Sequence, residues 1–183
     1  MKTKLKNHLM IGICLLFLSV SINAQMGNSE VLSKIENPKM YQTIDLVQMD
    51  RNLTTFASLI KLSGLDTSME FAKDHTVLAP TNDAFMQMSI DKFANLTNPK
   101  NKTDLIKFVK HHIIPNKVMS YTLKENDIVD LNNEKVIAID SETNLLTIGG
   151  ANVIKADVEA SNGIIHVVDN VVVPTTNVVF GYD

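Results

Sequence analysis

The chain has 183 residues, of which 45% are hydrophobic and 20% are charged, and its formal net charge is −3. This length suits one domain with its own hydrophobic core. The acidic balance argues against nucleic acid or an anionic membrane as a partner, because both attract basic surfaces. The one cysteine, Cys14, lies within the first 24 residues. A form that lacks those residues must therefore fold by packing alone, without a disulfide.

The first 24 residues have the layout of a cleavable secretory signal peptide. Three lysines precede an apolar run from Leu9 to Ile22, and the small residue Ala24 follows it. We expect cleavage after Ala24, which leaves 159 residues with a net charge of −6, because three lysines and no acidic residue are removed. The run is shorter than the roughly 20 apolar residues that span a bilayer, and the bulky Ile13 before Cys14 disfavours a lipid anchor. We therefore expect a secreted or periplasmic protein with no membrane insertion after signal cleavage.

The rest of the chain is predicted to form a polar spacer at residues 25–37, one domain at 38–175 and a short tail at 176–183. At the start of this domain, apolar residues recur at three- and four-residue spacings from Ile44 to Leu62. This spacing predicts an amphipathic helix, and Gly64 is placed to end it as a C-terminal cap.

One strand followed by two helices is predicted for the middle of the domain. Residues 76–80 predict a short strand that leads directly into a helix, for which Thr81–Asp83 offer side-chain caps. Residues 95–102 are predicted to be a polar loop. Thr103 is then predicted to cap a further helix, which ends at Pro115–Asn116.

The last third of the domain is predicted to be β-structure. Strands are indicated at 136–140, 144–148 and 153–159, and a β-branched closing strand runs within 161–174. The dipeptide Asn162–Gly163 is expected to supply the positive φ angles of a tight hairpin before that closing strand. Helices first and strands second, without βαβ alternation, predict an α+β domain with an antiparallel core rather than a parallel sheet.

Three segments resemble the fasciclin domain family. Residues 76–85, Thr-Val-Leu-Ala-Pro-Thr-Asn-Asp-Ala-Phe, resemble its first signature, and residues 162–171, Asn-Gly-Ile-Ile-His-Val-Val-Asp-Asn-Val, resemble its second. Residues 112–115, His-Ile-Ile-Pro, are similar to a middle element in which a Tyr-His pair precedes two aliphatic residues and a proline. Here His111 stands at the tyrosine position, and Asn116 stands where glycine is common. The order and separation match one complete copy of the domain.

The resemblance implies an α+β fasciclin-like domain in which N-terminal helices pack on an antiparallel, β-sandwich-like core. It implies that the two signatures are adjacent strands, with Thr81–Asp83 beside His166 and Asp169. It also implies an exported adhesion or matrix-associated module with no common enzymatic activity. Its partner would be a cell-surface protein, a matrix protein or a polysaccharide.

Two groups of residues are candidates for function. The first is the stretch around the middle element, for which the resemblance implies partner binding: His111, His112, Ile113, Ile114 and Pro115. The second is a polar framework near the two signatures: Thr81, Asn82, Asp83, His166 and Asp169. His166 and Asp169 sit among aliphatic residues, so each needs a hydrogen-bond partner or a route to water.

Catalytic and metal sites are less favoured by the same residues. His166 and Asp169 are three apart on a predicted strand, which places them on opposite faces and disfavours a shared catalytic pair. His111 and His112 are consecutive at a helix end and diverge around its axis, so they are poorly placed to chelate one ion. A polar loop carries four acidic residues, Glu125, Asp127, Asp130 and Glu134, without the order of a calcium loop. We predict no metal and no cofactor.

The sequence therefore favours an exported, non-enzymatic binding module that supports cell-surface or extracellular-matrix adhesion. One alternative is a periplasmic or secreted polysaccharide-binding accessory protein. The chain has no tryptophan and three tyrosines, so it is poor in the aromatic surfaces that favour sugar contacts. A further alternative from another class is a hydrolase that uses His166 and Asp169.

Overall fold

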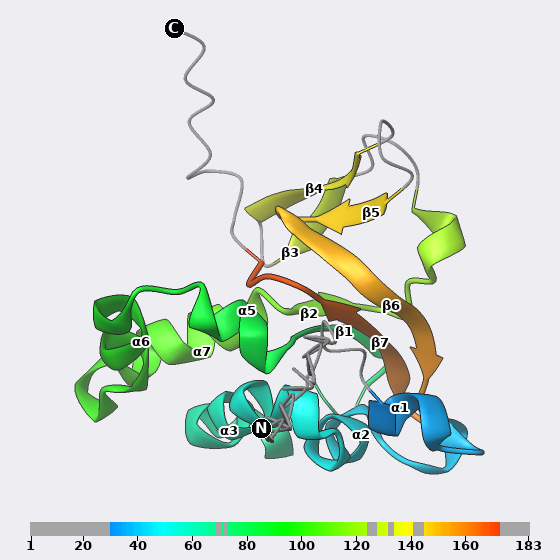
Figure 1. Ribbon diagram of the computed structural model, residues 1–183, viewed down its shortest axis with the longest axis horizontal. Coiled ribbons are helices and arrows are strands. Elements are labelled where there is room, and N and C mark those ends of the chain that lie inside the picture. The colour runs from blue at the N-terminus through cyan, green and yellow to red at the C-terminus, as the bar shows by residue number, and fades with distance from the viewer. Residues whose placement is uncertain are drawn as a thin grey trace, which may run out of the picture.

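The computed structural model describes residues 30–68, 71, 73–123, 128–131, 134–140 and 145–172 (Figure 1). The predicted leader, the predicted tail and the acidic residues Glu125 and Asp127 lie outside the described residues. Asp130 and Glu134 lie on strands. In the described part of the chain, no helix has the length and apolarity needed to cross a membrane.

The helical elements occupy most of the chain before residue 123. In order, they are α1 (Glu30–Lys34), η1 (Pro38–Met40), α2 (Thr43–Met49), η2 (Arg51–Leu53), α3 (Thr54–Ser63), η3 (Leu65–Thr67), α5 (Asn82–Met86), α6 (Ile90–Thr97), η4 (Pro99–Asn101), α7 (Lys102–Lys110) and η5 (Ser120–Thr122), where η denotes a 3-10 helix. The strands are β1 (His75–Pro80), β2 (Ile113–Pro115), β3 (Ile128–Leu131), β4 (Glu134–Asp140), β5 (Leu145–Ile148), β6 (Ala151–Glu159) and β7 (Gly163–Val168).

The predicted helix from Ile44 to Leu62 is present but interrupted at Asp50. This buried carboxylate accepts hydrogen bonds from the backbone N–H groups of Asn52 and Leu32, at 2.9 and 3.4 Å. It thereby stops α2 and starts the short η2 turn before α3. Gly64 ends α3 with a left-handed φ of 78°, as predicted, and its N–H donates to the carbonyl of Lys61.

Two of the predicted elements in the middle of the chain are wrong. Residues 95–97 belong to α6, which Ser89 caps by accepting from the N–H of Lys92. Residues 99–101 form η4 and α7 begins at Lys102, so most of the predicted loop is helical and Thr103 lies inside α7 instead of capping it. This helix ends at Lys110, because residues 113–115 pair with β1 instead of continuing α7. Aliphatic residues beyond a helix end satisfy a strand as readily as a further helical turn.

The seven strands form one sheet in the order β2-β1-β7-β6-β5-β4-β3. All pairings are antiparallel except β1 with β7, which is parallel and places His75 opposite Gly163 and Leu78 opposite His166. The two signatures are therefore adjacent strands, as the resemblance implied. The α+β class is confirmed, but the sheet is mixed and not wholly antiparallel, because β1 enters it from among the helices.

The sheet curls, so that its edge strands β2 and β3 contact one another (Figure 1). One face of β1 and β7, including Val77 and Ile165, packs with the helices in the main core. The other face, including Leu78 and Val168, packs inside the curl with residues of β5 and β6. Both strands of this parallel pair are buried along their whole length, and β7 is accordingly apolar at every position except His166.

Candidate functional site

The dipeptide Asn162–Gly163 joins three parts of the chain. Neither residue has a positive φ, so the predicted turn chemistry is wrong. Gly163 is needed because a Cβ there would collide with the backbone carbonyl oxygen of His75 and lie 2.9 Å from Cγ2 of Thr43. The Asn162 side chain accepts from the N–H of Thr43 at 2.9 Å and donates to the carbonyl of Phe71 at 2.7 Å.

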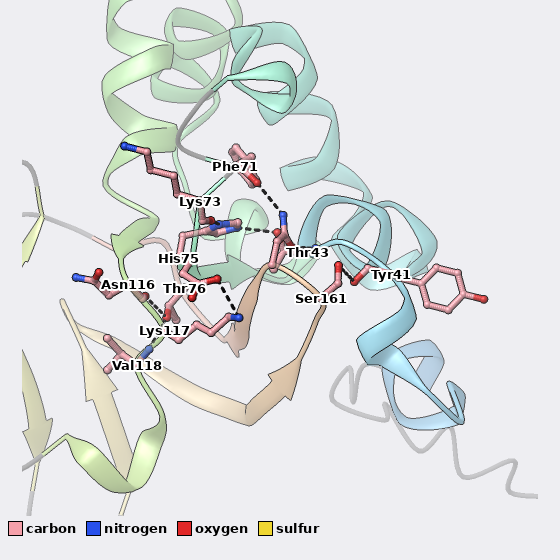
Figure 2. Close-up of polar contacts among 12 residues, drawn as sticks. Tyr41, Thr43, Phe71, Lys73, His75, Thr76, Asn116, Lys117, Val118 and Ser161 are labelled. Atoms are coloured by element: carbon pink, nitrogen blue, oxygen red, sulfur yellow. Dashed lines mark hydrogen bonds and ion pairs between the residues drawn. The ribbon is translucent and has the colours of Figure 1, made fainter.

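His75 lies at the centre of these contacts (Figure 2). Its Nδ1 bonds to the carbonyl oxygen of Lys73 at 2.7 Å, and its Nε2 lies 2.7 Å from the hydroxyl of Thr43. Because a carbonyl can only accept, Nδ1 donates and Nε2 accepts from Thr43. Burial lowers the pKa of His75, which favours this neutral form. Thr43, Phe71, His75, Asn162 and Gly163 are called the His75 cluster below.

His112 is a second buried imidazole, directly after α7. Its Nδ1 donates to the carbonyl of Phe108 at 2.8 Å, and its Nε2 accepts from the N–H of Val172 at 3.1 Å. The ring packs against Phe56 and Phe108. Burial lowers the pKa of His112 to about 4, so it is neutral at pH 7. The middle element therefore fastens the segment after β7 to α7.

His166 is the third, and it holds the strongly bent part of β6. Its Nε2 donates to the carbonyl of Val118 at 2.9 Å, and its Nδ1 accepts from the N–H of Asp157 at 3.1 Å. Asp157 has a positive φ of 59°, and the register of β6 against β7 shifts on both sides of Lys155. Burial lowers the pKa of His166. The imidazole thus accepts a hydrogen bond from a backbone N–H that has no partner on the neighbouring strand, because the pairing is irregular there.

Ser120, Asp157 and His166 lie together but in the wrong order for nucleophilic catalysis. The Ser120 hydroxyl donates to the Asp157 carboxylate, which also accepts from the Ser120 N–H at 2.7 Å. The base of a catalytic triad must instead lie between the nucleophile and the acid. Both His166 nitrogens are already bonded to backbone groups. The arrangement ties the segment after β2 to β6. The Ser120 proton points to Asp157, so His166 cannot accept it.

Asp169 lies beyond the end of β7 and has partners of its own. Its two carboxylate oxygens accept from the backbone N–H and the side-chain Nδ2 of Asn152, both at 2.8 Å. The Asp169 N–H donates to the Asn152 carbonyl at 3.0 Å. His166 and Asp169 therefore have separate partners, and the hydrolase alternative finds no shared site in them.

Thr81, Asn82 and Asp83 cover the other end of β1. The Thr81 N–H donates to the carbonyl of Val168, which places Thr81 beside the end of β7, and the Thr81 hydroxyl caps α5. The Asn82 side chain bonds to the N–H of Thr55 and the carbonyl of Arg51. Asp83 is exposed in the first turn of α5. Thr81 and Asn82 therefore join the start of α5 to β7 and to the helices before β1, and these bonds do not involve His166 or Asp169.

A pocket of about 320 Å³ opens on the outer side of His75. Its lining residues are Lys73, Asp74, His75, Lys110, Ile113, Pro115 and Asn116. Asn116 has a left-handed φ of 77°, its N–H donates to the Asp74 carbonyl at 3.1 Å, and its carbonyl accepts from the Thr76 hydroxyl at 2.9 Å. This φ gives the physical reason why glycine would be favoured at position 116.

The candidate partner-binding stretch is largely internal. His112, Ile113 and Ile114 are buried, His111 is half-buried and Pro115 is exposed. Ile113 and Pro115 reach the pocket. Reasoning from sequence missed His75, whose role depends on tertiary partners, and it missed the pocket, which forms only when β2 pairs with β1. In the described part of the chain, no group of three or more metal-ligating side chains could hold an ion.

The fold and these contacts define a fasciclin-type domain, and the similarity of this chain to known proteins agrees with that class. The fasciclin domain family matches residues 51–174, so the chain belongs to this family. Protein sll1483 of Synechocystis is 29% identical over 146 residues, which cover 80% of this chain and 81% of that protein.

Larger relatives contain this unit as one part. Pig transforming growth factor-beta-induced protein ig-h3 is 24% identical over 82% of this chain, which spans 22% of that protein. A solved FAS1 domain pair from the insect cell adhesion molecule fasciclin I has a TM-score of 0.53 and 15% identity, over 76% of this chain and 53% of that one. This structural similarity supports the fold.

A substitution of Gly163 tests the close approach of β7 to β1. We expect Gly163→Ala to lower the free energy of unfolding by about 3 kcal/mol, because the added methyl group meets paired backbone that cannot easily move. Gly150→Ala is the matched control: nothing lies within 4 Å of its Cβ, and only its φ of 79° opposes the change, at about 1 kcal/mol. Urea unfolding of both variants gives the comparison. Equal losses would contradict the steric role of position 163.

The buried histidines predict a loss of stability in mild acid. Their folded-state pKa values lie below 6.5, so the unfolded chain binds protons first as the pH falls. Well above pH 6.5 they add no pH dependence. Between that pH and its own folded-state pKa, each histidine lowers the free energy of unfolding by up to about 1.4 kcal/mol per pH unit. For His112 this continues to about pH 4.

The measurement for this prediction is urea unfolding between pH 7.5 and pH 4.5, within the range in which the chain refolds. His112→Gln, which cannot titrate, is expected to be less stable at neutral pH but to lose less stability on acidification. A wild-type stability that stays constant across this range, or an unchanged slope in the variant, would count against neutral buried imidazoles.

Asp169 is expected to matter for stability. Asp169→Ala leaves the two Asn152 donors without their acceptor, which is expected to cost about 1 to 2 kcal/mol and to lower the melting temperature. Asp83→Ala removes an exposed carboxylate from α5 and is expected to change stability by less than about 0.5 kcal/mol. If the two variants had the same melting temperature, the contacts between Asp169 and Asn152 would not contribute to stability as proposed.

Proposed function

We propose that this protein is an exported, non-enzymatic binding module that supports cell-surface or extracellular-matrix adhesion through protein or glycan contacts. The observation that carries the proposal is the fasciclin fold, which the chain shares with an insect cell adhesion molecule. The sequence pattern of residues 1–24, typical of a signal peptide, supports export to the periplasm or the cell exterior.

The use of the polar side chains supports a non-enzymatic role. His75, His112 and His166 are neutral, and both ring nitrogens of each form hydrogen bonds inside the domain. Groups engaged in this way are unavailable to accept or deliver a proton without opening the fold. These polar residues, in or beside the family signatures, therefore serve to stabilise the domain, and we assign recognition to the outer surface.

Partner contact is proposed for the accessible part of the stretch from His111 to Pro115. Three of its residues are buried and hold β2 in place, which leaves His111 half-buried and Pro115 exposed. They lie at the two ends of the segment that runs from the end of α7 through β2. A partner that recognises this region would touch His111, Pro115 and the exposed side chains around the pocket.

A polysaccharide-binding accessory role is the second candidate. Tyr121 is 77% exposed and Tyr41 is 39% exposed, so the domain presents some aromatic surface despite having no tryptophan. Aromatic rings stack well on the apolar faces of sugars. A relative bears the name fasciclin-like arabinogalactan protein elcF, from Phaeosphaeria nodorum, and is 27% identical over 71% of this chain.

Binding measurements with the mature chain test the proposal. We expect saturable binding to immobilised native cell-envelope extract or to matrix proteins at near-physiological salt. The double substitution His111→Ala with Pro115→Ala is expected to weaken that binding about tenfold, because interface residues that pack centrally dominate affinity. Lys100→Gln, at the opposite end of α7, is the control and is expected to bind as the wild type does.

A glycan array run in parallel separates the two candidates. Hits that disappear in Tyr121→Ala, with no binding to proteins, would favour the accessory role. Absence of binding above background to extract, matrix proteins and glycans would overturn the adhesion proposal.

A further inference from the structure

We infer that the pocket beside His75 binds a small amphipathic carboxylate, a molecule with an apolar body and one anionic group. The site adjoins the protein or glycan surface proposed above and shares Pro115 with it, but binding of a small ligand here does not depend on an adhesion partner. Its volume of about 320 Å³ falls at the lower end of the range for ligand sites. That is room for about ten water-sized groups.

The walls of the pocket are mainly apolar. Ile113 and Pro115 from β2 form one side, and the imidazole of His75 forms part of another. The long aliphatic stems of Lys73 and Lys110 add apolar surface. His75 contributes a neutral ring, since both of its nitrogens are bonded within the domain. A ligand must therefore bring an apolar portion to fill this space.

Among the described residues at the pocket, basic side chains outnumber acidic ones, in a protein whose overall charge is negative. Lys73 lines it from the bend before β1 and Lys110 from the end of α7, and Asp74 is the one carboxylate among the lining residues that the structure describes. The Asp74 carboxylate is paired at 3.0 Å with Lys117, which offsets its charge. Figure 2 shows Lys73 extending away from Thr43, on the far side of His75. This arrangement favours an anionic group over a cation.

The pocket is held open by structure that the fold needs for other reasons. Asn116 is fixed by its bonds to Asp74 and Thr76, and the Thr76 hydroxyl also accepts from the N–H of Val118 at 2.8 Å. On the inner side, the His75 cluster fixes the start of β1. Because both walls are set before a ligand arrives, little ordering opposes binding.

The test uses the mature protein and octanoate, which has ten non-hydrogen atoms, followed by amide NMR. We expect saturable shifts at the amides of Asp74, Ile113 and Asn116. Lys73→Gln is expected to weaken octanoate binding at least threefold, because a charge-assisted contact is lost. Lys100→Gln makes the same change in net charge at the far end of α7 and is expected to leave the affinity unchanged.

Two further probes separate the parts of the ligand. Octan-1-ol keeps the chain without the charge and inorganic phosphate keeps a charge without the chain, so both are expected to bind more weakly than octanoate. Shifts that fail to saturate, shifts that map to another surface, or an equal loss in Lys100→Gln would overturn the pocket assignment. Phosphate binding as tight as octanoate binding would overturn the amphipathic class of ligand. A failed adhesion assay would leave these outcomes unaffected.

Discussion

The parallel contact of β1 with β7 is the interaction on which the rest of the domain depends. It brings together two segments that are far apart in the chain, and it requires Gly163 because the carbonyl of His75 occupies the space of a side chain. Once the strands are in register, the helices cover one face and the curled sheet covers the other. Two strands buried on both faces leave no solvent for their polar groups, so every such group needs an internal partner.

Neutral imidazoles solve that problem at three places. A neutral histidine offers one donor and one acceptor on opposite sides of a rigid ring, so it can join two backbone segments without burying a charge. His75 joins β1 to α2, His112 joins α7 to the segment after β7, and His166 joins β7 to the bulge of β6. A lysine or a carboxylate at any of them would carry a charge into the core, where its desolvation would be costly.

Local signals in the sequence were sufficient for elements that depend on local physics. The Gly64 cap, the Thr81 cap and the β4–β6 strands are of this kind. The parallel pairing was not predictable from the order of elements, since one early strand joins a sheet made mostly of late ones. Asn162–Gly163 has the composition of a turn, yet its function is a steric and hydrogen-bonding contact with distant segments. Nothing in the flanking residues distinguishes these uses.

The candidate site likewise combines features that depend on local sequence with features that depend on distant contacts. The stretch after Lys110 could be identified from its resemblance to a family element, but its burial follows from becoming a strand beside β1. That pairing turns the chain at Asn116, and the left-handed turn leaves a space between the strand ends and α7. The pocket is therefore a geometric consequence of the contacts that stabilise the domain. A rigid, positively rimmed space of this kind can evolve toward a ligand by changes at exposed positions such as Lys73, without disturbing the histidines behind it.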